Sequence, residues 1–96
     1  MAQASSEQTA SSESVLVTLP DGVDLHARPA ADFVRTAMGF ASQVQVEANG
    51  RAADAKSLLT VLALGAKAGT ELRVTATGED AAAALDALRE RVATLA

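Results

Sequence analysis

The 96-residue chain has no cysteine, no tryptophan and no tyrosine, and it contains only one histidine and two phenylalanines. The absence of cysteine excludes disulfides, iron–sulfur clusters and thiolate metal sites, and one histidine leaves too few ligands for a structural zinc site. We therefore expect neither a metal nor a cofactor. Because 49% of the residues are hydrophobic and almost none are aromatic, a small single-domain core must consist mainly of aliphatic side chains and alanine.

Charge and hydropathy exclude two classes of partner. The net charge of −4 argues against nucleic acid, because phosphate binding draws on clustered lysine and arginine. No apolar run approaches membrane-spanning length, and the sequence does not begin with the pattern of a signal peptide. We expect a cytoplasmic monomer that binds neither nucleic acid nor membrane. From His26 to Arg73, six basic residues outnumber four acidic ones, which suits acidic protein partners but also fits scattered surface charge.

Hydrophobic periodicity divides the chain into a tail and one folded domain. Residues 1–14 are polar and have no apolar period, which predicts a disordered tail, and residues 15–96 form the predicted domain. Alternating and helical spacings predict strands at 15–19, 43–48, 51–54 and 71–77, and helices at 27–38, 58–64 and from Glu79–Asp80 to about Leu95. The order β-α-β-β-α-β-α predicts an α+β two-layer sandwich, with helices on one face of an antiparallel sheet.

His26 lies in the run Leu25-His26-Ala27-Arg28-Pro29, directly before the first predicted helix. Pro29 suits the first turn of a helix, so we expect the helix to begin between Ala27 and Pro29. The unpaired first amides and the helix dipole attract an oxyanion and favour a neutral, nucleophilic imidazole over a charged one. Arg28 adds donors that match phosphate geometry. Position alone does not separate a phosphate-accepting histidine from an ordinary capping or surface residue.

Three ordered blocks carry a resemblance to a known family. Leu25-His26-Ala27-Arg28-Pro29-Ala30-Ala31 resembles the active-site signature of HPr, the histidine-containing phosphocarrier of the bacterial phosphoenolpyruvate-dependent sugar phosphotransferase system. The block Ala55-Lys56-Ser57-Leu58-Leu59, with Val61-Leu62-Ala63-Leu64-Gly65 after it, is similar to the regulatory-serine segment of that family. The block Ala76-Thr77-Gly78-Glu79-Asp80 is similar to its last strand and the start of its last helix.

The resemblance implies a fold and a function. The fold is an open-faced sandwich of four antiparallel strands in the order 1-4-2-3, with three helices covering one side. In the family, enzyme I transfers phosphate from phosphoenolpyruvate to the histidine, and a sugar-specific EIIA protein removes it. By resemblance, His26 is the acceptor, Arg28 stabilises the transferring group, and Ala27 and Pro29 form the helix start that supports the phosphate. The chain lacks a nucleotide-binding loop and a paired acid–base set, so we expect a covalent carrier and not an enzyme.

Ser57 is a good N-cap for the short helix that Gly65 closes. The resemblance adds regulation, since in many Gram-positive bacteria an HPr kinase/phosphorylase acts on the matching serine. A phosphate there would place negative charge in a docking surface for acidic partners.

Leu58 and Leu59 begin a short helix that is apolar on nearly all sides. Such a helix cannot bury every face against a sheet, so some of its side chains should be exposed. We predict that Leu58 and Leu59 form a partner-docking patch, with burial of either one in the core as the alternative.

Two residues depart from the family pattern. Asp24 stands where the family usually has glycine, and Thr60 stands where many members have another glycine. A carboxylate two residues from His26 would repel an incoming phosphate unless it faces away. Neither departure removes the histidine, the arginine or the proline.

Other functions fit parts of the sequence. A regulatory adaptor of the same fold would act through Ser57 and use His26 little, and a carrier of a nitrogen or fructose branch would share the same residues. An acyl carrier protein is also small and acidic, with a serine before an apolar helix. However, Lys56 precedes Ser57 where that family requires aspartate, and alternating strands contradict an all-helical bundle.

Overall fold

The secondary structure follows the predicted order. The structure, a computed structural model, describes residues 12–95. Its elements are β1 (Ser12–Thr18), α2 (Ala27–Met38), β2 (Gln43–Ala48), β3 (Arg51–Asp54), α3 (Leu58–Ala63), β4 (Glu71–Thr77) and α4 (Ala81–Ala93). The bounds of α2, β2, β3 and β4 are those predicted, and α3 ends one residue earlier than predicted.

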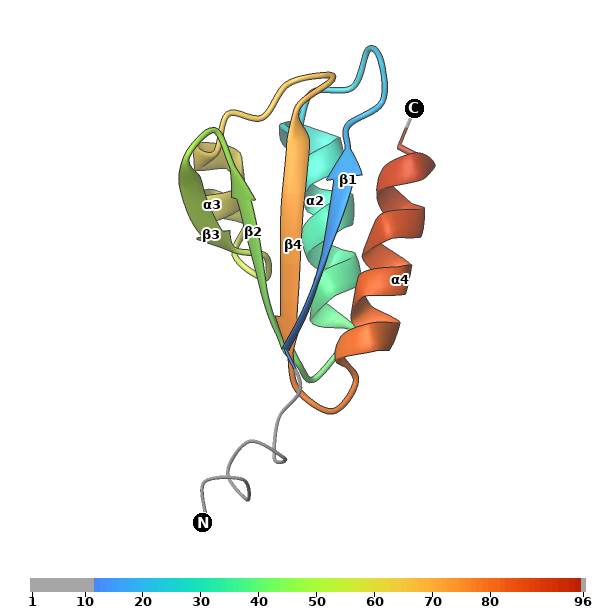
Figure 1. The fold of residues 1–96 in the computed structure, drawn as a ribbon. Coiled ribbons are helices and arrows are strands. Elements are labelled where there is room, and N and C mark those ends of the chain that lie inside the picture. The colour runs from blue at the N-terminus through green and yellow to red at the C-terminus, as the bar shows by residue number, and fades with distance from the viewer. Residues whose placement is uncertain (1–11, 96) are drawn as a thin grey trace.

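The four strands form one antiparallel sheet in the order β1-β4-β2-β3. The inner strand β4 pairs with β2 on one side and, on the other, with β1 from the far end of the described chain. The helices α2, α3 and α4 lie together behind the sheet, and the opposite face of the sheet is open (Figure 1). The predicted fold class and strand order are therefore confirmed.

The core lies between the sheet and the helices. Along β2 and β4 alternate residues are buried, as the period of two predicts. Helix α2 buries a stripe made of Ala30, Phe33, Val34 and Ala37. Phe33 is the largest fully buried side chain described, and removing it from water contributes about 2 kcal/mol or more. The buried stripe of α2 thus belongs to the same core as the sheet.

The hairpin between β2 and β3 turns at Asn49 and Gly50. Their φ values of 54° and 76° are both positive, as the predicted type I′ turn requires. The Asn49 side-chain amide donates to the carbonyls of Leu64 and Gly65 at 3.1 and 3.4 Å. The hairpin is therefore tied to the end of α3.

Strand β1 begins earlier than the pattern predicted. It extends from Ser12 to Thr18, whereas alternation indicated residues 15–19. Ser12 to Ser14 pair with β4, and the hydroxyls of Ser14 and Thr75 are 2.8 Å apart. Residues 12–14 thus belong to the sheet and not to the predicted tail, because pairing with a neighbouring strand needs no apolar period. The rest of the predicted tail, residues 1–11, lies outside the described part of the chain.

The start of α4 also differs from the prediction, because the helix begins at Ala81 and not at Glu79 or Asp80. Asp80 is the N-cap residue, but its side chain makes no capping hydrogen bond to its own helix. Its carboxylate instead accepts the amides of Ala41 and Ser42 at 2.8 and 2.9 Å. Near the other end, Leu95 is half-buried.

Candidate functional site

His26 is the N-cap residue of α2, at the end of the molecule where the loops before α2 and before β4 meet (Figure 1). Its backbone is extended, with φ −138° and ψ 168°, and its side chain is exposed. The imidazole makes no capping hydrogen bond to the helix. The ring is therefore accessible to a macromolecule approaching this end.

The imidazole has one polar contact within residues 12–95. Its Nδ1 lies 3.3 Å from the backbone carbonyl oxygen of Asp24, which also accepts the backbone N–H of His26 at 2.9 Å. A carbonyl only accepts, so this contact is a hydrogen bond only when Nδ1 carries a proton. No carboxylate in the described chain lies within ion-pair distance of the ring.

The first residues of α2 present free donors. Within residues 12–95, no hydrogen bond occupies the amides of Ala27 and Arg28. Pro29 has no N–H, so it leaves no third unpaired donor at this helix start. Two amides and the positive end of the helix dipole are therefore available to an oxyanion beside His26.

Ala27 has a φ of 44°, in the left-handed region. A residue with a Cβ there costs roughly 1–2 kcal/mol relative to an ordinary helical conformation. The sequence contains no signal for this, since left-handed positions usually carry glycine or asparagine. The predicted helix start is correct, but its first residue has a strained backbone.

Arg28 is the second residue of α2, and its side chain is exposed. It forms no ion pair with any acidic residue among residues 12–95. Its guanidinium is therefore uncommitted, as a group that binds an incoming phosphate must be.

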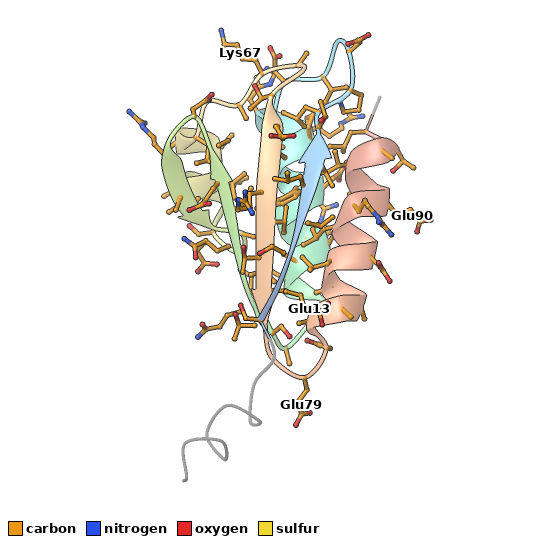
Figure 2. The ribbon with its side chains drawn as sticks, in the orientation of Figure 1. Glu13, Lys67, Glu79 and Glu90 are labelled. Atoms are coloured by element: carbon orange, nitrogen blue, oxygen red, sulfur yellow. The ribbon has the colours of Figure 1, made fainter. Side chains whose placement is uncertain are left out.

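The segment before His26 is anchored to the rest of the domain. Leu25 is buried, and its amide donates to the carbonyl of Ala66 at 2.8 Å. The amide of Ala68 donates to the Asp24 carboxylate at 2.9 Å. Both partners belong to the loop that carries Lys67 at the upper end of Figure 2. The Asp24 carboxylate is thus engaged by a backbone donor, which was not predictable from its position in the sequence.

Ser57 is the N-cap of α3, as predicted. Its half-buried hydroxyl accepts the amide of Thr60 at 3.4 Å, and its own amide donates to the carbonyl of Asp54 at 3.0 Å. The Thr60 hydroxyl donates to the carbonyls of Asp54 and Ser57 at 2.9 and 3.0 Å. A glycine at position 60 would lack these bonds. Thr60 therefore closes the turn before α3 with hydrogen bonds that the usual glycine could not make.

Leu58 and Leu59 are 41% and 79% exposed, whereas Val61 and Leu64 are buried. The exposure predicted for the two leucines is confirmed. Helix α3 packs beside α2, the helix that begins after His26.

The described residues offer few other kinds of site. Within residues 12–95, no group of three or more histidine, cysteine or acidic side chains is arranged to hold a metal ion. No helix of this part of the chain is long and apolar enough to cross a bilayer. A shallow hollow lies over the sheet, lined by polar side chains such as Gln43, Gln45, Asp54 and Thr75. None of the residues that line it belongs to the start of α2.

Comparisons with known proteins agree with the fold. A family model described as "PTS HPr component phosphorylation site" matches residues 12–94. A multiphosphoryl transfer protein of Xanthomonas campestris pv. campestris is 49% identical over 73 residues, which are 76% of this chain but only 8% of that protein. The phosphocarrier protein HPr of Haemophilus influenzae is 42% identical over 71 residues, 74% of this chain and 84% of the relative.

A solved structure gives the same result. The crystal structure of HPr-C-His from Thermoanaerobacter tengcongensis superimposes with a TM-score of 0.81 and 35% identity. The match covers 85% of this chain and 92% of the other.

Proposed function

Because the chain belongs to the HPr family, whose members are phosphocarriers of the phosphotransferase system, we propose that it accepts a phosphoryl group from enzyme I on His26. We further propose that it passes this group to sugar-specific EIIA proteins in the cytoplasm. The observation that carries the proposal is the exposed imidazole of His26 beside the free amides of Ala27 and Arg28.

The transfer requires one lone pair and a place for the negative charge. The lone pair of the neutral ring forms the nitrogen–phosphorus bond, while the bond from phosphorus to the donor protein breaks and its electrons leave with the donor. The contact between Nδ1 and the Asp24 carbonyl is long, at 3.3 Å, so little is lost when the ring reorients to present its lone pair. Delivery to the next protein reverses the step, with that protein as the nucleophile.

The charge on the phosphoryl oxygens is met by α2 and by Arg28. The amides of Ala27 and Arg28 point out of the helix start, where an anion is stabilised. Pro29 supports this start by fixing the backbone of the first turn. The Arg28 guanidinium is exposed and unpaired with any described acidic residue, and it adds charge-assisted donors. Because the site is open, the phosphoryl group stays reachable for the second partner.

Regulation at Ser57 is the second part of the proposal. The Ser57 hydroxyl is half-buried and its bond from Thr60 is long, so an HPr kinase/phosphorylase has to displace only a weak contact. A phosphate there would lie next to Leu58 and Leu59, which we propose as the patch that contacts enzyme I and EIIA. Its negative charge would oppose acidic partners.

The test is phosphorylation by enzyme I with phosphoenolpyruvate, followed by intact-protein mass spectrometry. We expect one added phosphoryl group that is labile in acid, stable in alkali and absent from His26→Ala. Arg28→Ala should be phosphorylated roughly ten- to a hundredfold more slowly, with partial recovery in Arg28→Lys. Undiminished labelling of His26→Ala would contradict the assignment.

The exposed leucines of α3 also fit a regulatory adaptor that binds partners without carrying phosphate. In such an adaptor, the His26→Ala substitution would leave partner binding unchanged. In a carrier, the same substitution would abolish phosphoryl transfer. A carrier of a nitrogen or fructose branch would pass both tests and differ only in the EIIA protein that accepts its phosphate.

A further inference from the structure

The two ends of α3 are bonded to the two ends of β3. At the start of the helix, the carbonyl of Asp54, the last residue of β3, accepts the amide of Ser57 at 3.0 Å and the hydroxyl of Thr60 at 2.9 Å. At the other end, side chains of the β2–β3 hairpin donate to the last carbonyls of the helix. The strand and the helix lie side by side, at the edge of the molecule away from α4 (Figure 1).

Asn49 and Arg51 make the contacts at the C-terminal end of α3. The Arg51 guanidinium donates to the carbonyl of Ala63 at 3.2 Å, and the Asn49 amide donates to the carbonyls of Leu64 and Gly65 at 3.1 and 3.4 Å. No other hydrogen bond from residues 12–95 reaches these three carbonyls. We refer to the bonds of Asn49 and Arg51 to this helix end as the C-terminal clamp.

The hairpin directs Arg51 towards α3. Residues two apart in a strand point to the same side of the sheet, so Arg51 shares the helix-covered side with Ala53, which is buried. Arg51 forms no ion pair with an acidic residue among residues 12–95. Its bond is to a carbonyl at the negative end of a helix, where a cation is favourable.

Helix α3 is too short to keep its own position. It has six residues, and an isolated helix of that length is unstable in water. Val61 is its one buried residue, and the buried Leu64 follows it directly. A short helix with so few buried side chains can tilt unless its ends are fixed. Its orientation on the sheet therefore depends on the contacts at both ends.

From these contacts we propose that Asn49 and Arg51 are positioning residues for the docking patch of Leu58 and Leu59. The clamp fixes one end of α3, and the helix carries that constraint to the first turn, where the two leucines lie. A partner then meets leucines that are already in place, so docking does not have to order the helix. The inference about docking rests on the proposed function, whereas the inference that the clamp holds α3 does not.

One double variant removes the clamp without removing the hairpin turn. In Asn49→Asp the carboxylate cannot donate to a carbonyl, but Asp-Gly still favours a type I′ turn. Arg51→Ala removes the guanidinium. The single variant Arg51→Lys keeps a positive charge and a donor, so it tests whether the clamp can be restored in part.

The matched control makes the same two changes of charge elsewhere. Gln43→Glu adds one negative charge and Arg73→Ala removes one positive charge, as the clamp double variant does. Both residues are exposed and alternate with the buried residues of β2 and β4, so they lie on the open face of the sheet.

The first measurement is amide hydrogen exchange by NMR, in the whole protein without partners. The amides of Val61 and Leu64, bonded at 3.0 and 3.1 Å, report on α3, and the amide of the buried Val34 reports on α2. We expect the α3 amides of the clamp double variant to exchange about threefold to tenfold faster relative to Val34. The ratio should be unchanged in the control and intermediate in Arg51→Lys. A general loss of stability would accelerate both helices and leave the ratio the same.

The second measurement is the steady-state rate of phosphorylation by enzyme I. We expect the clamp double variant to have a KM about threefold higher, because docking now has to order α3. Its kcat should stay within about twofold of the wild type, since His26 and the start of α2 are unaltered. The control should match the wild type in both constants.

The proposal is overturned if the exchange ratio of the clamp double variant equals that of the wild type, or if the ratio rises and KM does not. A lower melting temperature with neither change would give Asn49 and Arg51 a purely structural role, which also overturns it. If the wild-type protein accepts no phosphate from enzyme I, the proposed function fails and the docking role with it. The exchange ratio then still decides whether the clamp holds α3.

Discussion

The carboxylate of Asp80 accepts hydrogen bonds from both the backbone amide and the hydroxyl of Ser42, 38 residues earlier in the chain. It also accepts the amide of Ala41 at 2.8 Å. Ser42 is 2% exposed and is the buried polar side chain in the described residues. The loop before α4, which carries Glu79, lies at the opposite end of the molecule from Lys67 (Figure 2). The carboxylate of Asp80, far from the candidate site, therefore links the loop before α4 to the loop before β2.

Replacing Asp80 should make stability less dependent on acid. The hydroxyl of Ser42, followed by the amide of Ala41, lowers the pKa of Asp80 below its ordinary value of 3.8. A lowered folded-state pKa stabilises the protein above the unfolded value, and this stabilisation is lost as pH falls through the folded value. We expect Asp80→Asn to melt at a lower temperature than the wild type at pH 7, with the two melting temperatures converging as the pH falls below 3.8.

Asp86→Asn is the control for that experiment. Asp86 is an exposed residue of α4 that pairs with Arg89 at 3.2 Å. Exposed pairs of this kind contribute little to stability, so the melting temperature of Asp86→Asn should be close to that of the wild type at every pH. If the difference in melting temperature between Asp80→Asn and the wild type stays constant across the acid range, the charge of Asp80 does not account for the stabilisation.

Because Gly78 has no side chain, Ser42 can pack directly against its backbone. A Cβ on Gly78 would lie 2.8 Å from the Cα and 2.9 Å from the Cβ of Ser42, and the φ of Gly78 is +148°. Gly78→Ala therefore has to displace the backbone around Ser42. We expect a loss of about 1–3 kcal/mol in the free energy of unfolding, measured with urea, which is typical of overpacking.

Gly39→Ala provides the comparison for Gly78. A Cβ on Gly39 would meet only the carbonyl oxygen of Thr36 at 3.4 Å, and its φ of −76° is accessible to alanine. The change should be less than about 1 kcal/mol. Equal losses in both variants would mean that the contact with Ser42 is not what requires glycine at position 78.

The sequence predicted those parts of the fold whose side chains repeat with a regular period. Helix α2 and strands β2 and β4 each bury residues at regular intervals, so their bounds were correct. The first residues of β1 are serine and glutamate, which have no such period and are ordered by pairing with β4. Local patterns carry no information on pairing between distant segments.

The candidate site also has some features that follow from local sequence and others that depend on contacts between distant segments. His26, Arg28 and Pro29 are neighbours in sequence, so their common location at a helix start followed from local rules. The bond between Asp24 and Ala68 spans 44 residues and depends on how two loops meet. The hydrogen bonds of Asp80 could not be predicted for the same reason, because the donors that it meets belong to the loop before β2.

Ala27→Gly should stabilise the folded protein. Ala27 has a φ of 44°, which is accessible to glycine without strain. Relief of the left-handed conformation outweighs the greater entropy of glycine in the unfolded chain, so we expect a gain of up to about 1 kcal/mol in urea unfolding. Ala31→Gly, within the same helix, should instead lose about 1 kcal/mol. A loss of that size in Ala27→Gly would show that position 27 behaves as ordinary helix.

Leu59→Ala should separate docking from stability. The Leu59 side chain is 79% exposed, so its removal should change the free energy of unfolding by no more than about 0.5 kcal/mol. If the exposed leucines of α3 contact enzyme I, as we propose, truncating a partly buried interface residue should cost about 1 kcal/mol of binding, which is about a fivefold rise in the KM for the carrier.

Met38→Ala is the matched control for Leu59, since Met38 is 63% exposed and lies at the far end of α2 from His26. Its truncation removes a similar apolar area at a place that the transfer partners need not reach, so the KM should stay unchanged. Equal effects of the two variants on KM would indicate a general loss of surface hydrophobicity. An unchanged KM in Leu59→Ala would show that this residue is not part of the docking patch. Because the exposed side chain contributes little to folding, a change in stability would not mask an effect on binding.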